Sequence, residues 1–182
     1  MGKVINEVSK FLSYVLRHEP QSIKLMLDRD GWAVIDDLIA GAIESGRNLD
    51  YSLIQDVVLS SDKQRFEISS DGRRIRAVQG HSTSLVDREY SELEPPQFLY
   101  HGTATRFLDS IRNQGLVAGS RHYVHLTQNK LTARAVGQRY GVPVLLRVSS
   151  LEMFSKGFKF FKAENDVWLT ISVPAEFLTK EE

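Results

Sequence analysis

The chain has 182 residues, 23 basic and 23 acidic side chains, and no cysteine. Its length suits one large domain or two small ones, and its 42% hydrophobic residues suffice for a buried core. The zero net charge argues against nucleic-acid binding through a basic surface, and the absence of cysteine excludes disulfides, zinc–thiolate sites and a cysteine nucleophile. Because no apolar run is long enough to span a bilayer and no signal-peptide pattern opens the chain, we expect a cytoplasmic protein with no membrane partner.

The N-terminal segment carries the pattern of an amphipathic helix followed by a short strand. Apolar residues from Val4 to Leu16 fall on one helical face, and Pro20 predicts that the helix ends near His18. Residues 30–34 predict a turn followed by a short extended piece.

Two further helices and a hairpin are expected next. Asp36 or Asp37 is expected to cap a helix that Gly46 closes, and Asp50 to cap another. Alternating segments on either side of a glycine-containing turn then predict a β-hairpin. Its strands are expected at residues 65–68 and 74–78. Helices followed by a hairpin are typical of a winged helix, an outline that many binding modules share and that says little about function.

Residues 79–97 are poor in apolar side chains and contain Pro95-Pro96, so we expect a connector there. The connector divides the chain into a domain over residues 1–90 and a second domain over residues 91–182. Within it, Gly80-His81-Ser82 is either a functional turn or an ordinary part of the loop.

The second domain is expected to open with a strand over residues 98–102 that ends in a tight turn at Gly102. Glycine lets a ligand approach the main chain closely, because no Cβ stands in the way. His101 and Thr103 would place an imidazole and a hydroxyl on either side of that gap. The alternative is an ordinary strand-to-helix turn in which Thr103 caps the next helix.

The rest of the chain alternates short strands with helices. A helix over residues 129–140 is expected to turn Leu131, Ala135 and Val136 inward. The other expected elements are a helix over residues 105–114 and strands over 122–126, 144–148, 158–161 and 167–173. Many short strands with two packed helices predict a small, mostly antiparallel α+β domain.

Basic residues stand out at the end of the first helix and on the hairpin. Arg17 and His18 either complement the helix dipole or present a guanidinium fork and an imidazole to a phosphate. Arg74 and Arg76 share one face of the hairpin, where they are either solvated or in contact with phosphate.

A third group of polar residues lies on the expected strand over residues 122–126. Alternation places Arg121 and His125 on one face and His122 on the other, so a metal site built from the two histidines is not expected. No P-loop and no Gly-rich dinucleotide motif occurs in the chain.

In their order and spacing, these segments resemble the KptA-type RNA 2'-phosphotransferase family over nearly the whole chain. The motifs that carry the resemblance are Leu12-Ser13-Tyr14-Val15-Leu16-Arg17-His18, Asp30-Gly31-Trp32, Arg65-Phe66, Gly80-His81-Ser82, Leu99-Tyr100-His101-Gly102-Thr103, Ser120-Arg121-His122-Tyr123-Val124-His125-Leu126 and Val167-Trp168-Leu169-Thr170. The resemblance implies an α+β fold with an N-terminal winged-helix lobe, residues 1–90, that binds RNA. It also implies a C-terminal lobe, residues 91–182, that is ADP-ribosyltransferase-like, mostly antiparallel, and binds NAD.

The resemblance further implies an activity and the residues that perform it. The family removes an internal RNA 2'-phosphate, such as one left by tRNA splicing, by moving it to NAD. The products are 2'-OH RNA, nicotinamide and ADP-ribose 1'',2''-cyclic phosphate. The family's catalytic tetrad corresponds to Arg17, His18, Arg65 and Arg121. Its NAD pocket corresponds to His101, Gly102 and Thr103, to which we add His125.

The resemblance also implies the substrates of the protein, and two alternative functions remain. We expect an RNA with an internal 2'-phosphate and NAD as substrates, no metal, and a monomer. One alternative is an ADP-ribosyltransferase that modifies terminal phosphates of RNA or DNA. Another is a winged-helix nucleic-acid module without catalytic activity, which the intact tetrad and the His-Gly-Thr motif disfavour.

Overall fold

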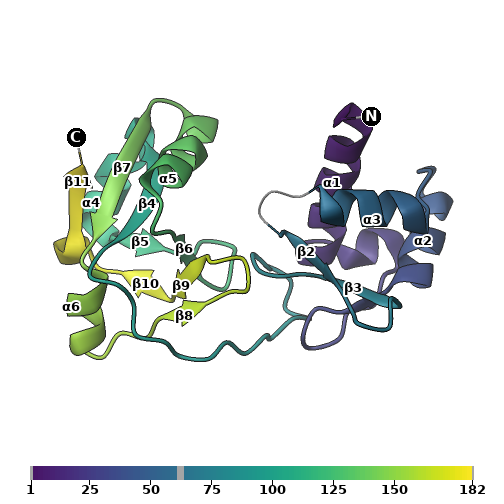
Figure 1. Ribbon diagram of the computed structural model, residues 1–182. Coiled ribbons are helices and arrows are strands. Elements are labelled where there is room, and N and C mark those ends of the chain that lie inside the picture. The colour runs from purple at the N-terminus through teal and green to yellow at the C-terminus, as the bar shows by residue number, and fades with distance from the viewer. Residues whose placement is uncertain (1, 61–63, 182) are drawn as a thin grey trace. The chain divides into compact units, whose positions relative to one another are not determined.

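The structure is a computed structural model that describes residues 2–60 and 64–181. The chain divides into two compact units, Met1–Glu89 and Tyr90–Glu182, here called unit 1 and unit 2 (Figure 1). Each unit combines helices with small antiparallel sheets, which confirms the predicted mixture of helix and antiparallel strand. Within the described ranges, no helix has the length and apolar character needed to cross a bilayer.

Unit 1 consists of helices packed on a small sheet. Its elements are α1 (Gly2–Arg17), η1 (Pro20–Ile23), β1 (Ala33–Val34), α2 (Ile35–Glu44), α3 (Tyr51–Leu59), β2 (Phe66–Ile68) and β3 (Arg74–Ala77). Leu12 and Leu16 of α1 meet Leu38, Ile54 and Ile75 in one hydrophobic core. The inward face of α1 therefore matches the predicted pattern, except that Val4 is exposed.

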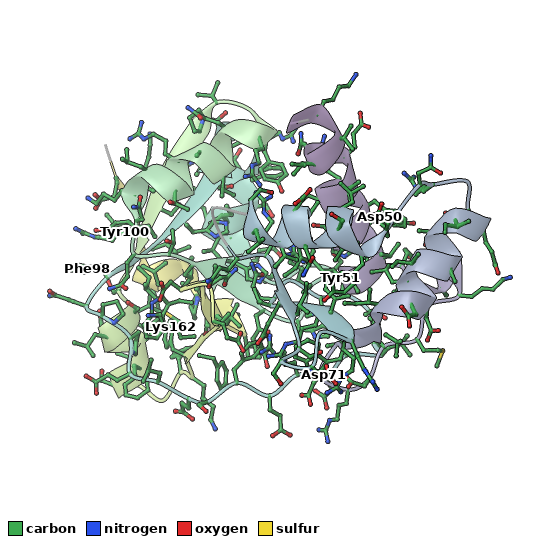
Figure 2. The ribbon with its side chains drawn as sticks, turned by 45° about the vertical axis from the view of Figure 1, so that its right-hand side comes forward. Asp50, Tyr51, Asp71, Phe98, Tyr100 and Lys162 are labelled. Carbon is green, nitrogen blue, oxygen red and sulfur yellow. The ribbon has the colours of Figure 1, made fainter. Side chains whose placement is uncertain are left out.

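Of the two predicted helix caps in unit 1, one is confirmed and one is wrong. The Asp50 carboxylate accepts a hydrogen bond from the Leu53 amide at 2.8 Å, so α3 begins as predicted (Figure 2). The prediction that Asp36 or Asp37 caps α2 is wrong. The chain passes from β1 directly into α2 through Val34, which leaves both carboxylates inside the first helical turn.

The predicted hairpin is confirmed, and β1 adds a strand to it. In the antiparallel sheet β1-β3-β2, Phe66 lies opposite Ala77. Ile75 is fully buried in the core, as alternation predicts. The guanidiniums of Arg74 and Arg76 lie on the other face over the Trp32 ring, 5.5 and 4.3 Å from its centroid.

The first part of the predicted connector belongs to unit 1. Val86 is 1% exposed, and the buried Arg88 guanidinium donates to the Val78 carbonyl. Residues 80–89 of the predicted connector thus have no helix or strand but pack onto unit 1. Hydrogen bonds and one apolar anchor hold this stretch, although few of its residues are apolar.

Unit 2 is built from short antiparallel sheets and helices. Its elements are β4 (Leu99–Ala104), η2 (Thr105–Phe107), α4 (Leu108–Gln114), β5 (Leu116–Val117), β6 (Val124–Leu126), α5 (Lys130–Gly137), η3 (Gln138–Tyr140), β7 (Pro143–Val148), α6 (Ser150–Ser155), β8 (Phe161–Lys162), β9 (Trp168–Thr170), β10 (Ser172–Val173), η4 (Ala175–Phe177) and β11 (Leu178–Glu181). The sheets are β11-β7-β4, β6-β9-β8 and β10-β5. Leu99, Leu126, Met153, Phe160 and Val148 are buried in a common core.

Helix α5 lies beside β4 and β7, but with a different face inward than predicted (Figure 1). Ala133 and Gly137 are buried, whereas Leu131 is 79% exposed and Ala135 is exposed. Of the three residues predicted to point inward, only Val136 is half-buried. The reason is the close approach of β4, which leaves room only for the smallest residues of the helix.

Candidate active site

The predicted site residues form two groups, one in each unit. Unit 1 contains Arg17, His18 and Arg65, and unit 2 contains His101, Gly102, Thr103, Arg121 and His125.

Arg17 is the last residue of α1, and the start of β2 holds its side chain. The guanidinium donates through Nη2 to the Arg65 carbonyl at 3.4 Å and lies over the Phe66 ring, 5.8 Å from the centroid. A cation at this position also complements the negative end of the helix dipole. The fold therefore brings positions 17 and 65 together, although 48 residues separate them in sequence.

The Gly80-His81-Ser82 turn lies against the same helix end. The amides of Ser82 and Thr83 donate to the Arg17 carbonyl at 2.9 and 3.2 Å. Nδ1 of His18 is 2.8 Å from Oγ of Ser82. A Cβ built on Gly80 would be 3.7 Å from Nη1 of Arg17, so the turn passes directly beside the guanidinium. The sequence pointed to this turn only through its motif and gave no role for Ser82.

In unit 2, hydrogen bonds link His101 of β4 to His125 of β6, and His125 to Arg121. Nδ1 of His101 is 3.0 Å from the His125 carbonyl, and Nη1 of Arg121 is 2.9 Å from Nδ1 of His125. Arg121 and His125 are therefore in direct contact, although Arg121 lies on a bend before β6 and not on the predicted strand face. Arg121 thus contacts the imidazole of His125, and the imidazole of His101 contacts the main chain of His125.

These contacts define the proton positions on both rings. A carbonyl only accepts hydrogen bonds, so Nδ1 of His101 must carry a proton. A guanidinium only donates, so Nδ1 of His125 must be an acceptor. Burial lowers the pKa of His101 and the charge of Arg121 lowers it further, while the hydrogen bond to His125 opposes them. His101 is therefore neutral near pH 7, and its Nε2 is a hydrogen-bond acceptor.

The lowered pKa of His101 predicts how the stability of unit 2 depends on pH. The unfolded chain protonates this imidazole around pH 6.5, and the folded chain only at lower pH. Stability should therefore fall as the pH drops below about 6.5, towards the folded pKa, and should not depend on this group at higher pH. Urea unfolding between pH 5 and pH 8, followed by the fluorescence of Trp168 in a Trp32→Phe background, measures this.

Replacing His101 should remove part of that pH dependence. Between pH 8 and pH 5, the free energy of unfolding of His101→Gln is expected to fall by less than that of the parent. His122, which is exposed on the neighbouring bend, provides the matched control. The explanation is wrong if His122→Gln flattens the pH dependence and His101→Gln leaves it unchanged.

Gly102 has a different environment from the one predicted. Strand β4 continues through Gly102 as far as Ala104, so the predicted tight turn is wrong. A Cβ on Gly102 would lie 1.6 Å from the carbonyl oxygen of Ala133 in α5. The glycine is needed for helix packing on that side, so the space that a side chain would fill belongs to α5 and not to a ligand.

Because Gly102 lies within the strand, the predicted arrangement of its neighbours is also wrong. Because side chains alternate along a strand, His101 and Thr103 both point to the face opposite α5. They lie on one face and do not flank a turn, and Thr103 is buried within β4 and does not cap a helix. On that face, Nδ1 of His101 contacts the main-chain carbonyl of His125. Across the described ranges, no group of three or more metal-ligating side chains is found.

Comparison with known proteins shows where this fold and these residues belong. The chain belongs to the RNA 2'-phosphotransferase, Tpt1/KptA family, whose profile matches residues 3–172. This match confirms the resemblance stated from the motifs.

Relatives of known name agree with this assignment over almost the full length. The RNA 2'-phosphotransferase of Escherichia coli (strain K12) is 58% identical over 176 residues, which cover 97% of this chain and 96% of that protein. A probable RNA 2'-phosphotransferase of Burkholderia lata is 60% identical over 171 residues, covering 94% of this chain and 88% of that protein. Family membership supports a transferase that acts on RNA.

Proposed function

We propose that this chain removes an internal 2'-phosphate from RNA by transferring it to NAD. The observation that carries the proposal is the gathering of Arg17, His18 and the start of β2 at the end of α1, in a chain of the 2'-phosphotransferase family. The zero net charge agrees with it. A 2'-phosphate carries more charge than a bridging phosphate, so a few guanidiniums can select it without a basic surface.

Unit 1 is proposed as a winged-helix lobe that holds the RNA phosphate. Helices packed on a hairpin with one added strand support that description. Arg17 is assigned to the phosphate because its guanidinium is held at one edge by the Arg65 carbonyl. Arg65 of unit 1 and Arg121 of unit 2 are each assigned to stabilising charge on the phosphoryl oxygens. His18 is assigned to proton transfer.

Unit 2 is proposed as an ADP-ribosyltransferase-like lobe that holds NAD. Neutral His101 offers an acceptor at Nε2, which suits a ribose hydroxyl. Arg121, with His125 accepting from one of its nitrogens, offers a cation for the phosphates of NAD or of the RNA. Thr103 shares the face of His101, and Gly102 keeps that strand close to α5. Gly102 therefore supports the pocket by packing and not by direct contact.

The proposed chemistry has two steps. An oxygen of the RNA 2'-phosphate bonds to C1'' of the nicotinamide ribose, the C1''–N bond breaks, and nicotinamide leaves. The ribose 2''-hydroxyl then attacks phosphorus, and the bond to the RNA 2'-oxygen breaks. One proton leaves the 2''-hydroxyl and one reaches the RNA 2'-oxygen, which gives 2'-OH RNA and ADP-ribose 1'',2''-cyclic phosphate.

The test is to incubate the protein with NAD and RNA that carries a single radiolabelled internal 2'-phosphate. We expect the label to appear in a small product that depends on NAD, together with RNA that has lost its phosphate. RNA with a terminal phosphate is the control and should remain unmodified. Stable ADP-ribosylation of the terminal phosphate, without loss of an internal 2'-phosphate, would favour the alternative transferase activity. Loss of phosphate without NAD would contradict the proposal.

A further inference from the structure

We infer that Ser82 is a positioning residue that fixes the imidazole of His18 for proton transfer; the inference rests on the proposed function, in which His18 moves the proton. The carrying observation is the 2.8 Å distance between Oγ of Ser82 and Nδ1 of His18. The two residues are 64 positions apart in sequence, so the fold, and not local geometry, creates the contact.

Main-chain hydrogen bonds around Ser82 fix the position of its hydroxyl relative to the end of α1. The amides of Ser82 and Thr83 both donate to the Arg17 carbonyl, at 2.9 and 3.2 Å, and thereby tie the turn to the last residue of α1. Thr83 is itself buried, and Gly80 begins the turn with a φ of 92°, which glycine adopts without strain. Helix end and turn thus hold the two partners, His18 and Ser82, at a constant separation.

The hydroxyl of Ser82 suits both protonation states of His18. It donates to Nδ1 when the imidazole is neutral, which places the ring proton on Nε2. It accepts from the Nδ1 proton when the ring is cationic. Nδ1 is therefore satisfied in either state without rotation of the ring, and the proton of the neutral imidazole is held on Nε2. An alanine at position 82 would remove this constraint and allow the tautomer with the proton on Nδ1.

The test combines kinetics with nitrogen NMR of the His18 ring. Ser82→Ala should lower kcat about 10-fold, the value of one lost hydrogen bond, with little change in KM for the RNA. The ¹⁵N chemical shifts should change from a single tautomer, with the proton on Nε2, to a mixture. Ser82→Thr keeps the hydroxyl and should restore both readouts. Ser84→Ala is the matched control, because Ser84 is exposed in the same loop.

Each outcome separates this inference from the proposed function. A Ser82→Ala variant with the parent kcat and the parent tautomer overturns the inference. The inference is also overturned if Ser82→Ala and Ser82→Thr both lose activity while the His18 ring keeps the parent tautomer. That pattern would indicate a purely structural role for Ser82. If His18→Ala retains full activity, the role of His18 in the proposed function fails. If His18→Ala is inactive and Ser82→Ala behaves as the parent, only the role of Ser82 fails.

Discussion

His18→Ala and Arg65→Ala should each slow the overall reaction by about 10²–10³, equivalent to roughly 3–4 kcal/mol of transition-state stabilisation. In the proposed two-step reaction, the first step should suffer less, because an anionic phosphate attacks a nicotinamide ribose that already carries positive character and needs no general base. The second step needs proton transfer and stabilisation of charge on the phosphoryl oxygens. Both variants should therefore accumulate RNA that carries ADP-ribose on its 2'-phosphate.

A denaturing gel of radiolabelled 2'-phosphate RNA would show this intermediate as a slower band that persists. Arg47→Ala is the matched control for Arg65→Ala. The Arg47 guanidinium stacks on the Phe11 ring at 4.6 Å, but no motif or contact assigns it to the reaction. It should turn over substrate like the parent. Variants of His18 or Arg65 that leave only unreacted RNA would show that these residues act in binding or in the first step.

Gly102→Ala should destabilise unit 2 by about 3 kcal/mol or more, at the upper end of the range for overpacking. The added methyl group would lie 1.6 Å from the Ala133 carbonyl oxygen, so α5 must move away from β4. The larger Gly102→Val is expected to disrupt the fold of unit 2, and with it the proposed NAD binding. The proposed NAD pocket is therefore better tested at His101. Urea unfolding followed by Trp168 fluorescence, with Trp32 replaced by Phe, reports the stability of unit 2.

Gly119→Ala is the control for Gly102→Ala, because it introduces backbone strain without steric overlap. Gly119 has a φ of 65°, but a Cβ there would meet nothing within 4 Å. Its replacement should cost about 1–2 kcal/mol, the usual penalty for a non-glycine residue in the left-handed region. If Gly102→Ala proved less destabilising than Gly119→Ala, the packing explanation would be contradicted.

The sequence predicted several elements of unit 1 correctly, although the predicted cap of α2 and the predicted inward face of α5 are wrong. The face of α1, the cap at Asp50 and the register of the hairpin around Ile75 all follow from local pattern. It failed where a neighbour far away in sequence decides the outcome. Leu131 points to solvent because β4 comes so close to α5 that only smaller residues fit between them.

The candidate site shows the same division. The motifs identified Arg17, His18 and Arg121, and the structure provides the partners that the motifs do not contain. Gly102 was correctly singled out as a position that needs glycine, but for the wrong reason. A missing side chain looks the same in sequence whether a ligand or a helix fills the space. The contact between His18 and Ser82 depends on a turn that folds back onto α1, and no local pattern predicts it.

The contact between β4 and α5 has a consequence for the genetics of this chain. Gly102 lies against the Ala133 carbonyl oxygen, and a Cβ on Gly137 would lie 2.4 Å from the carbonyl oxygen of Thr103. In both cases the obstructing atom belongs to the main chain, which no substitution can shorten. Second-site suppressors of a change at either glycine therefore cannot act by trimming the obstructing neighbour. Revertants should restore the glycine itself or raise the stability of unit 2 at a distance.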